Sequence, residues 1–141
     1  MRKELEDKIF RRWPDWFRAS IDGTRSLMGF GFQCGDGWFD ILWRCFEAIE
    51  PSVADETKCW HPFEIVEVKE KFGVLRICGS PTIIETLAAI ERAEAESLTA
   101  CELCGRPGHL SYLSRSKKGL SSVRVQWESC SPSTSAIWIT I

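Results

Sequence analysis

The residues best suited to chemistry lie at positions 101–105, which read Cys-Glu-Leu-Cys-Gly. Two cysteines three positions apart, followed by glycine, match one half of a zinc knuckle. The tight turn points backbone amides at the sulfur atoms, and glycine adopts backbone angles that other residues resist. Tetrahedral zinc needs four ligands, so a second pair is required. The best set in the sequence is Cys101, Cys104, Cys130 and His109, with Cys59 or His61 as substitutes.

The CxxC motif has other interpretations. It can be a free pair of thiols at the end of a helix. A thioredoxin-type redox role fits less well, because the motif follows a predicted helix instead of preceding one in a βαβ unit. A nuclease of the treble-clef type would need catalytic histidines after the knuckle, and no histidine follows His109. The sequence therefore predicts a zinc site, with an unligated CxxC turn as the alternative.

Carboxylates suggest a weaker alternative, a metal-dependent hydrolase. Asp36 and Asp40 are four positions apart and would share one face of a helix, with His61 as a third group. An N-cap at Asp36 beside a surface acid at Asp40 is the simpler interpretation. The two histidines of the chain do not allow a Ser-His-Asp or Cys-His-Asn set to be assembled. We therefore predict no catalytic residues and expect that the protein is not an enzyme.

Two further groups of side chains suggest binding. Large aromatic rings are enriched at protein interfaces, although core packing is the commoner role of any one tryptophan. The predicted partner-binding residues are Trp13, Trp16, Trp38 and Trp60. Basic residues beside Phe72 predict, as an alternative, a patch that binds nucleic acid. These are Lys69, Lys71 and Arg76, joined in the last part of the chain by Arg115, Lys117 and Lys118. A solvated hairpin tip is the simpler interpretation of that patch.

The composition is that of one ordinary globular domain. The chain has 141 residues, 44% of them hydrophobic and 27% charged. A net charge of −2 does not indicate a strongly basic nucleic-acid binder. The opening residues, MRKELEDKIF, do not resemble a signal peptide, and no membrane-spanning stretch is expected. Seven cysteines, an odd number without a secretory signal, predict a reduced intracellular setting.

The spacing of apolar residues predicts an α+β fold. Helices are expected over residues 3–19, 37–50 and 81–99. Pro14 interrupts the first helix, Asp36 is expected to N-cap the second, and Pro51 follows its end. A glycine-punctuated strand is expected over residues 26–34, and a β-hairpin, with Gly73 in its turn, over residues 63–78.

These elements predict a single α+β domain over residues 1–110. It consists of a small antiparallel sheet around the hairpin, packed with about three helices, and a cysteine knuckle at 101–109 closes the last helix. Residues 111–141 are predicted to be a serine-rich tail. Its apolar end, AIWITI, predicts either an added edge strand or a partly disordered segment.

Three segments carry a resemblance to a known group of proteins. They are GFQCGDGWFDILWRCFEAIE, EIVEVKEKFGVLRI and AEAESLTACELCGRPG. Together they resemble a family of small uncharacterised proteins from bacteriophages and prophages, and the resemblance covers about residues 28–110. Family members end in a short tail with a further cysteine and a histidine that complete a zinc site. Here Cys130 matches that cysteine loosely, and no histidine follows it.

The resemblance implies a phage protein that works in the cytoplasm of a bacterial host. Small phage accessory proteins commonly bind host machinery in a stoichiometric complex. The expected function is therefore a non-enzymatic accessory protein that binds and modulates a host protein complex, with an anti-CRISPR-like inhibitor of bacterial defence as one form of it. A zinc-knuckle module that binds nucleic acid is the alternative.

Overall fold

The computed structural model describes residues 1–20, 26–54, 61–114, 121–126, 130 and 137–140. Within these ranges it has the predicted α+β fold. The helical elements are α1 (Lys3–Arg12), η1 (Pro14–Ser20), η2 (Leu27–Phe30), η3 (Asp36–Trp38), α2 (Phe39–Val53) and α3 (Ile84–Ser97), where η marks a 3₁₀ helix. The strands are β1 (Glu64–Lys71), β2 (Val74–Ser80), β3 (His109–Ser114), β4 (Ser121–Gln126) and β5 (Ile137–Thr140).

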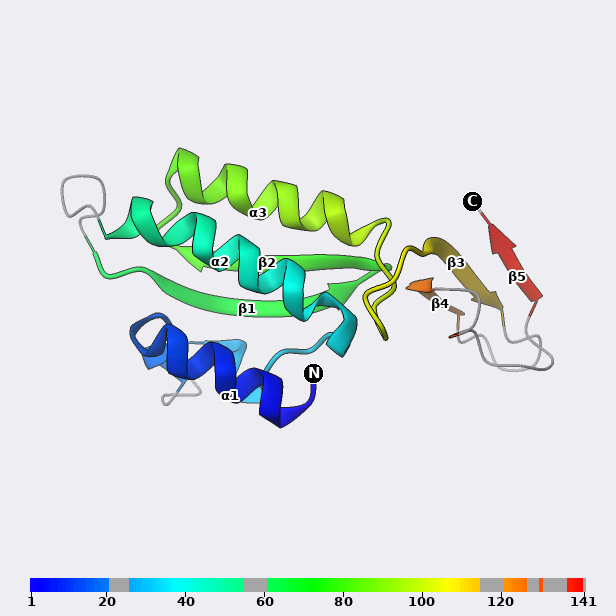
Figure 1. Ribbon diagram of the computed structural model, residues 1–141, viewed down its shortest axis with the longest axis horizontal. Coiled ribbons are helices and arrows are strands. Elements are labelled where there is room, and N and C mark those ends of the chain that lie inside the picture. Colours follow the sequence, from blue (N-terminus) through cyan, green and yellow to red (C-terminus); the bar gives the residue numbers. More distant parts are fainter. Residues whose placement is uncertain (21–25, 55–60, 115–120, 127–129, 131–136, 141) are drawn as a thin grey trace.

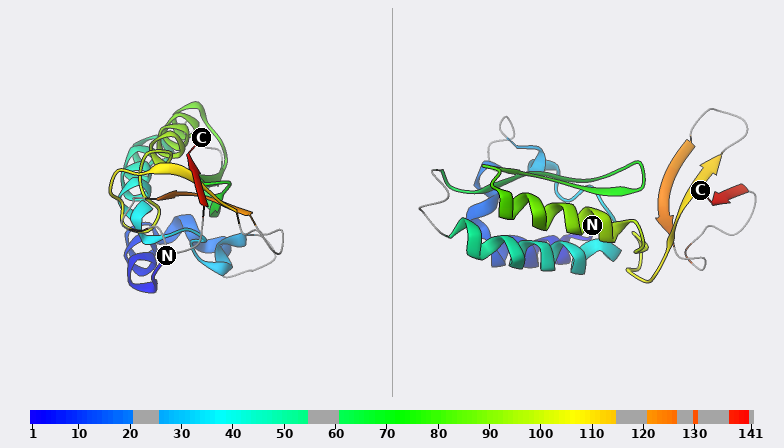
Figure 2. Two further views of the ribbon diagram at one scale, coloured as in Figure 1. Left: turned by 90° about the vertical axis from the view of Figure 1, so that its right-hand side faces the viewer. Right: turned by 90° about the horizontal axis from the view of Figure 1, so that it is seen from above.

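The main body is a helical layer packed on a hairpin. The helices α2 and α3 run side by side along the β1–β2 hairpin, and α1 lies on the side of α2 that is remote from α3 (Figures 1 and 2). Ion pairs bridge neighbouring helices: Arg12 binds Glu50 across α1 and α2 at 2.6 Å, and Arg44 binds Glu96 across α2 and α3. The apolar faces of the helices therefore turn toward one core shared with the hairpin.

The hairpin confirms the prediction for residues 63–78. Lys71 pairs with Val74, which leaves a loop of two residues, Phe72 and Gly73. Both have positive φ angles, 55° and 79°, as a type I′ turn requires. The backbone N–H of Gly73 donates to the Glu70 carboxylate at 2.6 Å and so holds the turn from within. The unforeseen feature is Phe72, an aromatic residue at a position that favours asparagine or glycine.

Most of the candidate contact tryptophans belong to the core. Trp13 is 3% exposed, Trp16 8% and Trp38 0%. Trp13 stacks on Trp16 with ring centroids 5.6 Å apart, and Trp16 meets the edge of Phe63 at 5.0 Å. The expectation that these three rings form a partner-binding surface is therefore wrong, because aromatic packing removes them from the surface. Trp60 lies outside the described residues.

The prediction of a strand over residues 26–34 is also wrong. Residues 27–30 form η2, and Gln33 alone of this stretch bridges to β1, beside Lys69. Gly31 turns the chain with a φ of 73°, and the N–H of Phe32 donates to the Glu6 carboxylate at 2.8 Å. The alternating apolar residues resemble a strand in sequence. In a strand, the N–H of Phe32 would bond to a neighbouring strand, but here it bonds to the side chain of Glu6 on α1.

The start of α2 differs from the prediction as well. Asp36 lies in η3 and does not cap α2; its carboxylate accepts hydrogen bonds from the backbone N–H of Arg2, at 2.7 Å, and from the Arg2 guanidinium. Pro51 lies inside the last turn of α2 instead of after its end. The Asp36 carboxylate is therefore bound by Arg2 instead of capping α2, as the sequence had predicted.

The last part of the chain forms a second sheet. Its strand order is β4-β3-β5, with β3 antiparallel to both neighbours. The apolar end of the chain is thus paired as β5 with β3, and not with the hairpin. This sheet lies beyond the end of the main body, and residues 101–108 connect the two (Figures 1 and 2). The predicted domain boundary after residue 110 falls inside β3.

Candidate metal centre

The predicted knuckle is present at the end of α3. Cys101 N–H donates to the Arg106 carbonyl at 2.7 Å, and Gly105 N–H donates to the Cys101 carbonyl at 2.8 Å. Gly105 has a φ of 73°, a conformation that residues with a Cβ atom rarely adopt. Ala100 and Pro107 close the turn with a β-bridge. The local sequence therefore folds as predicted and holds both cysteine side chains on one tight loop.

A third cysteine joins this pair from a distant part of the chain. The sulfur atoms of Cys101, Cys104 and Cys130 all lie within 4.8 Å of one another. The Cys104 and Cys130 sulfurs are 3.3 Å apart. Cys101 is fully buried, Cys104 is exposed and Cys130 is partly buried. Clustered thiolates are ligands that suit soft and borderline metal ions, so these three cysteines can hold a metal ion.

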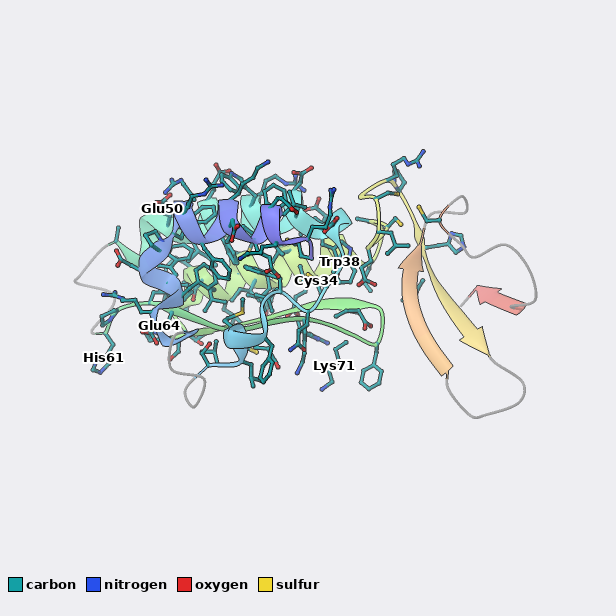
Figure 3. The ribbon with its side chains drawn as sticks, turned by 90° about the horizontal axis from the view of Figure 1, so that it is seen from below. Cys34, Trp38, Glu50, His61, Glu64 and Lys71 are labelled. Carbon is teal, nitrogen blue, oxygen red and sulfur yellow. The ribbon has the colours of Figure 1, made fainter. Side chains whose placement is uncertain are left out.

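The predicted fourth ligand is not placed with them. His109, the first residue of β3, is outside the group whose ligand atoms converge. Of the two substitutes, Cys59 lies outside the described residues. His61 lies at the end of the main body remote from Trp38, as Figure 3 shows. The described side chains therefore do not place His109 with the three sulfur atoms, and a fourth ligand at this position stays a prediction.

Hydrogen bonds give the thiols of Cys104 and Cys130 different pKa values. The backbone N–H and then the guanidinium of Arg106 lower the pKa of the Cys104 thiol from 9.0 to about 7, against the opposing effect of burial. The neighbouring Cys104 sulfur, followed by burial, raises the pKa of Cys130 to about 11. Of these two sulfurs, Cys104 is therefore the one that loses its proton first as pH rises.

The knuckle rests on the segment GDGW at residues 35–38. Gly37 N–H donates to the Glu102 carbonyl at 2.7 Å, and Trp38 Nε1 donates to the Ala100 carbonyl at 2.9 Å. A Cβ atom on Gly37 would lie 2.2 Å from the Cys101 carbonyl oxygen. This supporting role was missed in the sequence, although the two glycines before a buried tryptophan are a signal for close backbone approach.

The residues proposed for a hydrolase do not converge. Asp36 is bound by Arg2, and Asp40 is an exposed residue of α2. His61 is at the opposite end of the main body from Trp38, which follows Asp36 closely in the chain (Figure 3). The hydrolase alternative is therefore corrected for these residues, because no metal ion or substrate can contact all three.

The basic residues of the hairpin are largely neutralised. Lys69 pairs with Glu67 at 2.6 Å, and Arg76 pairs with Glu94 at 2.6 Å. Lys71 is exposed, with its ammonium 5.7 Å from the centre of the Phe72 ring. The three cations thus do not form the uncompensated patch that was expected. The other basic candidates, Arg115, Lys117 and Lys118, lie outside the described residues.

The hairpin tip is solvated, as the simpler interpretation of the sequence predicted. The Phe72 side chain is 74% exposed, although the ring is apolar. Strands β1 and β2 fix its backbone on both sides, and the Glu70 carboxylate holds the next residue of the turn. The ring is therefore presented to solvent on a rigid support.

Comparison with known proteins does not place this chain in a family. In the described part of the chain, no helix has the length and apolar character needed to cross a membrane. No protein-family model, curated protein or solved structure matches the chain.

Proposed function

We propose that the protein is a non-enzymatic binding protein that contacts a protein partner through the β1–β2 hairpin tip, with Phe72 as the central anchor. The observation that carries this proposal is the 74% exposure of an aromatic ring at a φ of 55°. A residue with a Cβ atom in this conformation loses about 1–2 kcal/mol relative to ordinary backbone. Asparagine or glycine would form the same turn without that cost. Binding of the ring by a partner explains why phenylalanine occupies the position.

The geometry of the tip favours tight binding. Aromatic anchors that fill a pocket on a partner contribute most of the energy of many interfaces. Affinity also rises when the anchor is already held in its bound conformation, since less conformational entropy is lost on association. The two strands and the hydrogen bond between Gly73 and Glu70 supply that rigidity. Lys71 beside the ring favours a pocket with an acidic rim.

The charges of the hairpin support a protein partner over nucleic acid. A nucleic-acid surface needs several uncompensated cations along the phosphate backbone. Lys69 and Arg76 are instead paired with Glu67 and Glu94. A zinc-knuckle module that stacks a base on Phe72 is the second candidate, and it predicts binding that weakens steeply as salt rises.

The resemblance to bacteriophage and prophage proteins supports a partner class. In this proposal the protein acts in the cytoplasm of a bacterial host and modulates a host protein complex. The most specific version of the proposal is that it inhibits a bacterial defence complex, as anti-CRISPR proteins do. Such proteins act by occupying a surface, which requires an anchor and no catalytic residues.

Zinc is the metal that we propose for the centre formed by Cys101, Cys104 and Cys130. Structural zinc sites are rich in thiolates, and bound zinc stabilises small knuckles that have little core of their own. Zinc here would join the knuckle to the segment that contains Cys130. Elemental analysis of gently purified protein tests this: stoichiometric zinc that is lost in Cys104→Ser supports the assignment, and protein without metal refutes it.

The binding proposal is tested by affinity capture from a bacterial host lysate, with and without nuclease. Phe72→Asn removes the ring but keeps the turn, because asparagine accepts a positive φ. Ile84→Asn is the matched control: Ile84 is 83% exposed at the start of α3, away from the tip. We expect a nuclease-resistant complex that Ile84→Asn retains and Phe72→Asn weakens by roughly 30-fold or more, as for an anchor worth about 2 kcal/mol.

Other outcomes of this capture would contradict the proposal. A complex that Phe72→Asn retains at full strength removes the anchor role. Capture that disappears with nuclease favours the nucleic-acid module instead. The fold is checked separately, because Phe72→Asn should leave the protein as stable as before or more stable by about 1 kcal/mol through relief of the backbone strain. A large loss of stability would show that the ring supports the fold.

A further inference from the structure

The described cysteines fall into three settings. Cys34 and Cys45 are buried in the core, and Cys78 is exposed on β2. Cys101, Cys104 and Cys130 form the cluster described above. Within the cluster, Cys104 and Cys130 have sulfur atoms 3.3 Å apart. The Cys101 sulfur also lies within 4.8 Å of both, but Cys101 is fully buried.

We infer that Cys104 and Cys130 are a peroxide-oxidisable pair, in which Cys104 is oxidised first and Cys130 then closes a disulfide that expels the metal ion. The substrate is a hydroperoxide, either hydrogen peroxide or an organic peroxide. The disulfide depends on the two sulfur atoms alone. The expulsion of metal rests on the proposed function, because it assumes that the three-cysteine centre holds zinc.

The reaction proceeds in two balanced steps. The Cys104 sulfur attacks the terminal oxygen of the hydroperoxide, the O–O bond breaks, and an S–O bond forms. The sulfur gives up two electrons to the peroxide, whose second oxygen takes the proton of the Cys104 thiol and leaves as an alcohol or water. The Cys130 sulfur then attacks the Cys104 sulfenic acid, the S–O bond breaks, and the hydroxyl leaves as water with the Cys130 proton. Two thiols and one hydroperoxide thus yield one disulfide, one alcohol or water, and one further water.

Access and distance select this pair over the alternatives. Cys104 is exposed, so a peroxide can reach its sulfur, whereas Cys101 is fully buried. A disulfide bond is about 2.05 Å long, so the sulfurs of Cys104 and Cys130 must approach by roughly 1.3 Å from their present separation of 3.3 Å. A side-chain rotation of Cys104, which is exposed on the knuckle, can supply that movement.

Oxidation would exchange one cross-link for another. A bound metal ion would join the knuckle to the segment with Cys130 through three sulfurs, and the disulfide would join the same two segments through two of them. A disulfide sulfur is a poor ligand compared with a thiolate, so Cys101 alone would be left as a strong ligand and the metal would leave. A thiol reductant would restore both thiols and the metal site.

The test treats full-length protein with hydrogen peroxide, once as purified with its metal and once after removal of metal by a chelator. Unreacted thiols are blocked, the protein is digested without reduction, and the cross-linked peptides are identified by mass spectrometry. A chromogenic chelator follows released zinc. We expect a cross-linked peptide joining Cys104 to Cys130, release of zinc in step with the disulfide, and recovery of both thiols with dithiothreitol.

Matched variants separate the steps. Cys130→Ser should accumulate the sulfenic acid of Cys104, which dimedone traps, and should form no disulfide in the cluster. Cys78→Ser removes the other exposed described cysteine and should behave as the unaltered protein does. Cys101→Ser should lose metal yet still form the disulfide between Cys104 and Cys130.

Each outcome distinguishes this inference from the zinc proposal. A disulfide in a protein that never contains metal would refute zinc and leave the oxidisable pair standing. The inference itself is overturned if peroxide joins Cys101 or Cys78 to another cysteine in preference. It is also overturned if Cys104 passes to the sulfinic acid without a disulfide, or if no oxidation occurs in either the metal-containing or the metal-free protein.

Discussion

Replacement of Ser97 by alanine should weaken the fold just where α3 passes into the knuckle. Ser97 is the last residue of α3 and is fully buried. Its hydroxyl accepts a hydrogen bond from Leu75 N–H at 3.0 Å and donates one to the Glu94 carbonyl at 2.6 Å. The serine, four positions before Cys101, thus ties the end of the helix to the start of β2.

The expected magnitude follows from the buried amide. Alanine would leave Leu75 N–H without its partner in the core, and an unsatisfied buried donor costs about 1–3 kcal/mol, so we take about 2. Unfolding entropy near 60 °C is about 2.1 cal/mol/K per residue, or roughly 0.3 kcal/mol/K for a chain of 141 residues. The free-energy loss therefore corresponds to a fall of roughly 7 °C in the unfolding midpoint.

Thermal unfolding followed by circular dichroism, with urea unfolding as a second measure, provides the assay. Thr99→Ala is the matched control, because the Thr99 hydroxyl makes a similar bond to the Glu96 carbonyl at 3.2 Å but is exposed. The control should stay within about 0.5 kcal/mol, or roughly 2 °C, of the unaltered protein. Equal shifts for the two variants, or no shift for Ser97→Ala, would refute the reasoning from the buried amide.

Three further predictions concern the site and its supports. Gly37→Ala should destabilise the protein by about 2–3 kcal/mol in urea unfolding, because the new Cβ atom would overlap the backbone of Cys101 and break hydrogen bonds of the knuckle; an unchanged midpoint would contradict the close approach. In metal-free protein, alkylation of Cys104 by iodoacetamide should reach half its maximal rate near pH 7, since its pKa is lowered; a midpoint near 9.0 would be inconsistent with this. Glu50→Gln should lower stability at pH 7, and this difference should shrink as pH falls below 4.5. The hydrogen bond from Arg12 lowers the pKa of Glu50 in the folded protein, so its contribution is complete above the unfolded pKa near 4.5 and is lost as pH falls through the lower folded pKa. A difference between the two proteins that does not change as pH falls would argue against this linkage.

Local patterns were sufficient for most of the helices and for the hairpin. The break at Pro14, the helix after GDGW and the turn at Gly73 are read from spacing within a few residues, and the structure has all three. Residues 26–34 show where such reading fails. Met28 and Phe32 are buried as a strand would bury them, yet the backbone satisfies its hydrogen bonds by a 3₁₀ turn and by contact with Glu6.

The candidate metal site also has a part that the local sequence predicts and a part that it does not. The CxxC turn was predictable because its geometry depends on the five residues from Cys101 to Gly105. The position of Cys130 beside this turn depends on the path of the chain through β3 and β4, which brings the segment with Cys130 back to the knuckle. No local pattern specifies such a return, since it depends on pairing between strands that are far apart in sequence.

The sequence by itself determined the fold class, the hairpin and the tight turn that holds two cysteines, because apolar periodicity and turn chemistry act over short distances. Only the tertiary structure decided which side chains face solvent. It placed Trp13, Trp16 and Trp38 in the core, neutralised Lys69 and Arg76 with carboxylates of their own chain, and left Phe72 exposed at the tip. Burial and charge pairing arise when distant segments pack, so the exposed ring emerged only in the folded chain, which also brought the predicted ligand Cys130 to the CxxC turn.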